Sequence, residues 1–322
     1  MRLKNFSAAN FVKILILAAF LQADSAVVRY SLDREKNTVT LCQKLLGELG
    51  VKSEEIANLD SLEKINEFLQ KNFLRKNERR FQEVANPGDA EKIQKILPIL
   101  AEFGMIGEAK PTKNDPDYLV ILGATVGTMR NRAQYALNLM SNEVKVLMDK
   151  NSTELAPKQV VILTSKRPLD QNCENDYVLF DLQWIRAGWF AEKRPENEAQ
   201  AAAFVWDQLP KSSAIDRLKF EVISTNGSEG TFETVEFFLK ELKKLGKKGQ
   251  YIVFVSSNPY VPYQNQVIEE AVLKADFDGE FETVGGELTN ENTKLSVLLD
   301  NIARYVYAMV QVKKMLETKK TA

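Results

Sequence analysis

Tyr118-Leu119-Val120-Ile121-Leu122 is a short, continuous apolar run that follows a turn-rich stretch and leads into a glycine-containing loop. Runs of this length, bounded by turn signals, are typical of strands buried on both faces of a sheet. Comparable runs recur over residues 160–163, 218–223 and 251–255, and residues 281–284 could form an edge strand. The chain therefore contains several strands that need cover on both of their faces.

Segments with helical periodicity separate these apolar runs. We expect helices over about 197–209, 231–246, 262–274 and 292–316, and a further helix after the first strand. Buried, β-branched strands that alternate with helices indicate an open parallel sheet covered on both sides. The predicted fold class is therefore α/β, a Rossmann-like, doubly wound and mainly parallel sheet.

The region before the first strand shows helical spacing and no alternating strand pattern. Leu41, Leu45 and Leu46 lie on one apolar stripe, and Asp60 or Ser61 can cap the next helix. The basic run over residues 71–80 reads as a solvated helix face. We predict an N-terminal helical subdomain over residues 26–112 and an α/β domain over residues 117–316.

Residues 1–25 have the pattern of a signal peptide. Basic residues precede an apolar run over residues 14–21, and small residues at Ala23 and Ser25 suit a cleavage site. The run is too short to cross a bilayer, which takes about 20 apolar residues. We expect a periplasmic or exported protein; the alternative is a retained first helix in a cytoplasmic one.

The composition excludes several kinds of chemistry. The 322 residues include no histidine, so Ser–His and Cys–His nucleophiles and histidine-ligated metals are absent. Cys42 and Cys173 are isolated, so no metal site is predicted. Export would allow these two cysteines to pair, whereas two free buried thiols fit equally well. A net charge of -1 gives no field that would attract nucleic acid, so no nucleic-acid partner is expected.

The loops after the first two strands carry candidate ligand contacts, because ligands bind beyond the carboxyl ends of parallel strands. Gly123 and Thr125 precede a helix start, where backbone amides can hold an anion, and Arg130 adds positive charge. The loop matches neither a P-loop nor a dinucleotide fingerprint, and a plain tight turn fits it equally. Ser165 and Lys166 place a hydroxyl and a cation after the second strand, a combination that suits phosphate or carboxylate.

The later loops add amides, hydroxyls and carboxylates. Asn226 and Thr231 follow the third strand, and Asn258 follows the fourth. Glu198 and Glu233 lie in the first turns of helices; they are candidate catalytic acid/base groups, and helix capping is the simpler interpretation. Polar loops that converge on one sheet edge predict a small-molecule pocket.

The segment between the second strand and residue 195 is long and carries large aromatic side chains. Trp184, Trp189 and Phe190 are its main aromatic residues. Burial against the sheet is the simpler interpretation of these side chains. The alternative is a lid that covers the ligand loops.

Five short motifs follow one another along residues 117–310: Leu122-Gly123 with Arg130 or Arg132, Thr164-Ser165, Glu198-Ala199, Asn226 with Thr231-x-Glu233, and Val255-Ser256-Ser257. In this order they resemble the YdcF/SanA-like family of bacterial domains. The resemblance implies a Rossmann-type fold. It also implies S-adenosylmethionine as a candidate cofactor, because one member is reported to bind it, and an association with the cell envelope.

The chain departs from the family pattern at three places. Lys166-Arg167 replaces a Gly-Gly pair, Val261 stands where the family has a histidine, and Tyr263 stands where it has an arginine. These departures put the family's activity in doubt, and whether the chain is an enzyme stays open. Glu198, Thr231 and Glu233 are the positions where the resemblance carries over most directly.

Two functional hypotheses follow. In the first, the chain is an exported, envelope-associated protein that binds an anionic nucleotide-like or phosphorylated ligand, with Glu198 and Glu233 contacting a ribose or acting as acid/base. In the second, the sheet is a degenerate, non-catalytic scaffold and the helical subdomain binds an envelope protein partner.

Overall fold

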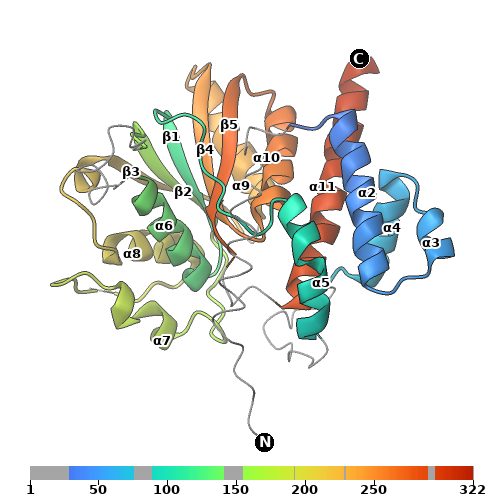
Figure 1. Ribbon diagram of the computed structural model, residues 1–322. Coiled ribbons are helices and arrows are strands. Elements are labelled where there is room, and N and C mark those ends of the chain that lie inside the picture. The colour runs from blue at the N-terminus through green and yellow to red at the C-terminus, as the bar shows by residue number, and fades with distance from the viewer. Residues whose placement is uncertain are drawn as a thin grey trace, which may run out of the picture.

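The computed structural model describes residues 29–75, 89–140, 155–191, 193–227, 230–288 and 294–321. Within these residues, five strands form one parallel sheet in the order β3-β2-β1-β4-β5 (Figure 1). The strands are β1 (Tyr118–Leu122), β2 (Gln159–Ser165), β3 (Lys219–Thr225), β4 (Gln250–Ser257) and β5 (Gly279–Gly286). The predicted α/β, Rossmann-like fold is confirmed, and the sheet is parallel throughout. The predicted signal peptide lies outside the described residues.

Two pairs of helices cover the two faces of the sheet. One face packs against α6 (Val126–Met140) and α8 (Glu198–Gln208), and the other against α9 (Thr231–Lys244) and α10 (Val261–Ala275). The side chains of β1 alternate between these two cores, and all five are buried. Each such burial stabilises the fold by about 1.5–3 kcal/mol. This is why the strand is apolar at every position.

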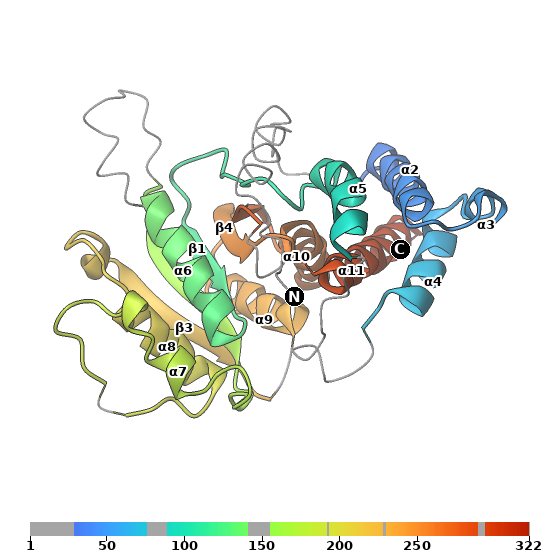
Figure 2. The same cartoon turned by 60° about the horizontal axis from the view of Figure 1, so that its bottom comes forward.

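A further layer of helices lies beyond α10 (Figures 1 and 2). It contains α2 (Leu32–Glu48), α3 (Ser53–Ala57), α4 (Leu62–Asn72) and α5 (Asp89–Glu102). The long helix α11 (Leu295–Thr321) packs against α10 on one side and against α4 and α5 on the other. Ser61 caps α4 by accepting a hydrogen bond from the Lys64 N–H. The core of the N-terminal helices is thus completed by the last helix of the chain.

The chain reverses its winding direction between β1 and β4. It runs from β1 outward through β2 to β3, and then returns to place β4 on the opposite side of β1. The carboxyl ends of β1 and β4 therefore flank the crevice in which such sheets bind ligands. The segment between β2 and α8 contains α7 (Asp176–Leu179) and the short 3₁₀ helix η1 (Leu182–Trp184), which lie on the α6 side of the sheet (Figure 1).

None of the helices in the described part of the chain is long and apolar enough to cross a membrane.

The outer edge of β5 is covered by residues 109–112, which precede β1, rather than by another strand. Ala109 pairs with Gly285 through the backbone, and the Thr112 N–H donates to a Glu282 carboxylate oxygen at 2.7 Å. This cover protects one edge of the sheet from pairing with other chains.

Candidate ligand site at the carboxyl edge of the sheet

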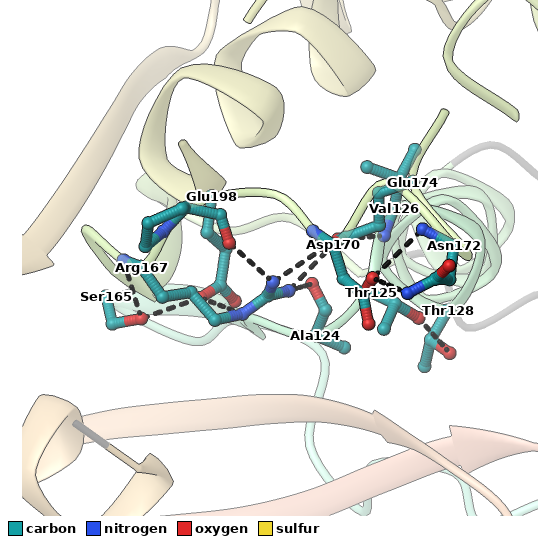
Figure 3. A network of polar contacts seen from close by, with 11 residues as sticks. Ala124, Thr125, Val126, Thr128, Ser165, Arg167, Asp170, Asn172, Glu174 and Glu198 are labelled. Atoms are coloured by element: carbon teal, nitrogen blue, oxygen red, sulfur yellow. Dashed lines mark hydrogen bonds and ion pairs between the residues drawn. The ribbon is translucent and has the colours of Figure 1, made fainter. Parts of the chain in front are cut away.

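Glu198 is the buried carboxylate at the centre of the β2 side of this edge (Figure 3). It begins α8, and its Oε2 accepts a hydrogen bond from the Ser165 hydroxyl at 2.8 Å. Gly123 allows the close approach, because a Cβ at this position would lie 2.6 Å from Glu198 Oε1. Three predicted site residues from three separate loops therefore meet at one place.

Arg167 connects Glu198 to a second buried carboxylate. Its Nε lies 3.1 Å from Glu198 Oε2, and its Nη1 lies 2.7 Å from Glu174 Oε2. A further bond at 3.2 Å joins its Nη2 to the Ala124 carbonyl (Figure 3). The guanidinium thus lies between two carboxylates at the position where the resembled family has a glycine. Sequence reasoning did not identify Glu174, because an irregular loop offers no spacing signal.

Glu174 also occupies the start of α6. Its carboxylate accepts hydrogen bonds from the Val126 N–H at 3.0 Å and from the Asp170 N–H at 2.8 Å. Its side chain is completely buried. Amides at a helix start favour negative charge, which is why an external anion was expected here. In the structure the chain's own carboxylate takes the Val126 amide of this helix start.

The pKa values in this network reflect a competition between burial and charge. Burial raises the pKa of the Glu198 carboxyl, while the Arg167 charge and the Ser165 hydroxyl oppose the shift. Burial works against the charged form of Arg167, but the hydrogen bond to Glu174 and the two carboxylate charges raise its pKa overall. Arg167 therefore stays charged, and it is shared between its two partners.

The two arginines of α6 have structural partners. Arg130 is buried and donates to the Val178 and Leu179 carbonyls and, at 2.6 Å, to Gln208 Oε1. It therefore binds the α7 segment and α8 instead of standing on the rim of the ligand edge as predicted. Burial lowers its pKa to about 10.

Arg132 links the two strands that flank the crevice. Its Nη1 donates to the Leu122 and Gly123 carbonyls, at 2.9 Å each, and its Nε lies 3.4 Å from the Ser257 hydroxyl. Burial lowers its pKa to about 10. Of the two arginines that fit the sequence pattern, Arg132 is the one at the end of β1.

Other predicted residues lie at the edge without joining the Glu198 network. Lys166 is exposed, and its Nζ donates to Asn226 Oδ1 at 3.2 Å. The hydroxyls of Thr125 and Thr128 lie 3.2 Å apart. The Asn258 side chain donates to the Gly107 carbonyl at 2.5 Å, which ties the end of β4 to the segment before β1.

The third loop has the geometry of a helix cap. Thr231 is the first residue of α9, and the Glu233 carboxylate accepts a hydrogen bond from the Gly230 N–H at 3.0 Å. This contact is the capping role that was the simpler interpretation of Glu233. It involves none of the residues around Glu198.

A cavity of about 250 Å³ opens on the α6 side of the edge, beside the ends of β4 and β5. Asn258 is the predicted site residue that lines it, together with Ser257. Its other lining residues include Thr128, Asn131, Gln134, Asn138, Trp184 and Glu287. The polar residues of α6 recur at three- and four-residue spacing, which any solvated helix face shows. The sequence pattern therefore contained no signal that distinguished this cavity.

The aromatic residues after β2 do not form one layer. Trp184 packs partly against the α6–α8 core and lines the cavity. Trp189 contacts Phe204 of α8 at 5.0 Å between ring centroids, and its indole N–H donates to Asp207 at 2.7 Å. Phe190 is 84% exposed. Trp189 therefore packs on α8, Phe190 lies at the surface, and Trp184 is partly buried against the core that the sheet shares with α6 and α8.

Both cysteines are free thiols. Cys42 is buried in the core of the N-terminal helices, and Cys173 is partly exposed beside Glu174. Burial raises the pKa of the Cys173 thiol to about 11. In the described ranges, no group of three or more cysteine or acidic side chains has the arrangement of a metal site.

Neither a protein-family model nor a curated protein matches this chain. The likeness to the YdcF/SanA-like pattern therefore depends on the order of its motifs along the sequence. The polar residues of the edge form two groups, an ion-paired group at the end of β2 and the lining of a cavity at the ends of β4 and β5.

Proposed function

We propose that this chain is a small-ligand-binding protein that holds a polar ligand at the carboxyl edge of its sheet and does not chemically alter it. The observation that carries this proposal is the cavity of about 250 Å³ at the ends of β4 and β5. The buried carboxylates Glu174 and Glu198 of the same sheet edge are paired with Arg167 instead. The position of the cavity, next to the reversal of winding between β1 and β4, supports ligand binding.

The state of the carboxylates argues against acid/base catalysis. A general acid or base must exchange a proton directly with its substrate or through one water. Glu198 is buried and engaged by both Ser165 and Arg167, and Glu233 caps α9. Both residues expected to be catalytic therefore have structural roles, Glu198 in a buried ion pair and Glu233 in a helix cap.

An anionic ligand is the second candidate, and Lys166 is the observation that favours it. Its ammonium group is exposed and bonds to the neutral amide of Asn226 rather than to a carboxylate. A phosphate or carboxylate at the loops after β2 and β3 could pair with it. S-adenosylmethionine or a nucleotide would be the ligand implied by the family resemblance.

A thermal-shift screen of the purified chain tests the proposal. The panel contains nucleosides, nucleotides, S-adenosylmethionine, neutral sugars and sugar phosphates. A ligand present at 100 times its Kd should stabilise the chain by about 2.7 kcal/mol. We expect at least one stabilising compound, recovered unchanged by mass spectrometry. Absence of any shift, or turnover that Glu198→Gln abolishes, would contradict the proposal.

We also propose that the chain is a divergent YdcF/SanA-like protein of the cell envelope. The meeting of Gly123, Ser165 and Glu198 supports this, because three separate parts of the family pattern converge. Amino-terminal sequencing of the protein recovered from its cells tests export. A mature chain that begins near Ala26 is expected, and a chain that retains Met1 would contradict export.

A further inference from the structure

The cavity beside α6 differs in chemistry from the rest of the edge. We infer that it binds an uncharged, hydroxyl-rich ring of monosaccharide size. This inference rests on the proposed function, that the edge binds a small ligand, and it names the class of that ligand. Size, hydrogen-bonding groups, charge and an aromatic lining residue each point to this class.

The size of the cavity limits the ligand to a single ring. Its volume is about 250 Å³. At ~30 Å³ per water molecule, this corresponds to roughly eight waters. One hydroxylated ring fills such a space, whereas a dinucleotide or a folded peptide segment would exceed it.

Three side-chain amides of α6 supply neutral hydrogen-bonding groups. Asn131, Gln134 and Asn138 lie at three- and four-residue spacing on one side of the helix. Gln134 Nε2 donates to Asn138 Oδ1 at 3.0 Å, which leaves Gln134 Oε1 to accept and Asn138 Nδ2 to donate. Within the described residues, the Asn131 side chain makes no hydrogen bond of its own. Paired donors and acceptors match hydroxyl groups, which both donate and accept.

The charge of the cavity disfavours an anion. Among its lining residues, Glu287 is a carboxylate and none is a cation. Arg132 reaches the Ser257 hydroxyl, but its guanidinium is already bonded to the Leu122 and Gly123 carbonyls. A phosphate here would face Glu287 with no cation among the lining residues to pair with it. Ligand hydroxyls would instead donate to this carboxylate in charge-assisted hydrogen bonds.

Trp184 adds an aromatic residue to the lining of the cavity. Within the described part of the chain its indole N–H has no hydrogen-bond partner. A sugar ring has C–H groups on its faces and hydroxyls at its rim. An aromatic residue and a row of amides in one lining therefore match both kinds of surface.

Isothermal titration of the full chain tests the inference with defined probes. These are D-glucose, D-galactose and N-acetyl-D-glucosamine, their phosphorylated forms, and AMP. Three substitutions probe the cavity: Trp184→Ala, Asn131→Ala and Glu287→Gln. Phe190→Ala removes an exposed ring of the same segment, and Asn72→Ala removes an exposed amide of α4, so these two are matched controls.

We expect at least one neutral sugar to bind, and its phosphorylated form to bind at least about tenfold more weakly. Trp184→Ala and Asn131→Ala should each weaken the neutral sugar by about tenfold or more, while the two controls leave it unchanged. Glu287→Gln should narrow the difference between each sugar and its phosphate. Binding of phosphorylated probes alone, unaffected by Trp184→Ala, would overturn the inference and leave the proposed function standing. Absence of binding by every probe here, and by the whole thermal-shift panel, would overturn both.

Discussion

The two halves of the carboxyl edge of the sheet differ in the polar groups that they carry and in how those groups are paired. At β2, the carboxylates of Glu174 and Glu198 are buried, and both pair with the partly buried Arg167. At β4 and β5, the cavity presents neutral amides such as Asn131 and Asn138 to open space. The charged side chains of the β2 half bind one another, whereas the amides that line the cavity have hydrogen-bonding groups available to a ligand.

The difference follows from the cost of burying charge. An unpaired buried carboxylate costs several kcal/mol, so Glu174 and Glu198 require a partner that the fold itself provides. A neutral amide in a half-open cavity stays hydrated at little cost until a ligand replaces the water. Structural charge and ligand recognition are therefore separated along one sheet edge. The predictions below test this separation, beginning with the largest expected effect.

Removal of Arg167 should have the largest effect on stability. Arg167→Ala leaves Glu174 and Glu198 buried without their cation, which should cost about 3–5 kcal/mol of the free energy of unfolding. Urea denaturation at neutral pH measures this cost. Lys166→Ala is the matched control, because it removes an exposed neighbouring cation and should change stability by less than about 0.5 kcal/mol. Equal effects of the two substitutions would contradict the assignment of Arg167 to a structural network.

Removal of Arg130 should destabilise the fold somewhat less. Arg130→Met keeps much of the buried aliphatic volume but leaves the Val178 carbonyl and Gln208 Oε1 without their donor, while the Leu179 carbonyl still accepts from Gln208 Nε2. An unsatisfied buried acceptor costs about 1–3 kcal/mol. The variant should show this loss in urea denaturation and still bind any ligand found in the screen. Loss of ligand binding in a variant that remains folded would instead place Arg130 at the ligand site.

Glu198→Gln should change how stability depends on pH. Burial raises the pKa of Glu198 in the folded chain above the ~4.3 of an unfolded glutamate. The folded state then holds the proton more tightly, so this residue's contribution favours folding in acid and is lost as pH rises above about 4.3. The stability of the wild-type chain relative to Glu198→Gln should therefore fall between about pH 4 and about pH 7.

Urea denaturation across this pH range measures that difference. Glu196→Gln is the control, because its exposed carboxylate bonds to Lys193, which lowers the pKa of Glu196. The wild-type chain should show no comparable fall relative to this variant. A rise in wild-type stability relative to Glu198→Gln would mean that the charge of Arg167 outweighs burial.

Asn131→Ala should have the smallest effect on stability and a large effect on binding. The side chain is partly exposed and makes no hydrogen bond within the described residues, so stability should change by less than about 0.5 kcal/mol. The stabilisation by a cavity ligand present at 100 times its wild-type Kd should fall from about 2.7 to about 1.4 kcal/mol or less, because the affinity falls by about tenfold or more. Thermal unfolding with and without ligand measures both effects, and an undiminished ligand shift would remove Asn131 from the site.

The fold was largely predictable because buried parallel strands have a local signature. The runs over residues 118–122, 160–163 and 251–255 are apolar for their whole length, the runs over 218–223 and 281–284 are interrupted by polar residues, and each of the five coincides with a strand. Helix capping by Ser61 was also predictable from the residue type and its position before an apolar helical repeat. These features depend on neighbours in the sequence, so the sequence alone reveals them.

The site was only partly predictable because its contacts join distant residues. Gly123, Ser165 and Glu198 converge as parallel topology requires, but Glu174 reaches the start of α6 from an irregular loop 48 residues away. Its carboxylate takes an amide of the helix start where an anionic ligand was expected. Trp184 lines the cavity, but it belongs to a largely irregular segment whose sequence has no helical or strand periodicity. Contacts between residues that are distant in the sequence produce no local sequence pattern from which they could be predicted.

Ligand-induced stabilisation of one variant from each half tests the central claim most directly. The thermal shift caused by the best ligand of the screen is measured for Glu198→Gln and for Trp184→Ala, each relative to the same variant without ligand. The division of the edge predicts that Glu198→Gln keeps the shift and that Trp184→Ala loses about half of it or more. The reverse result, with the shift lost in Glu198→Gln and kept in Trp184→Ala, would contradict the division and return the ligand to the β2 half.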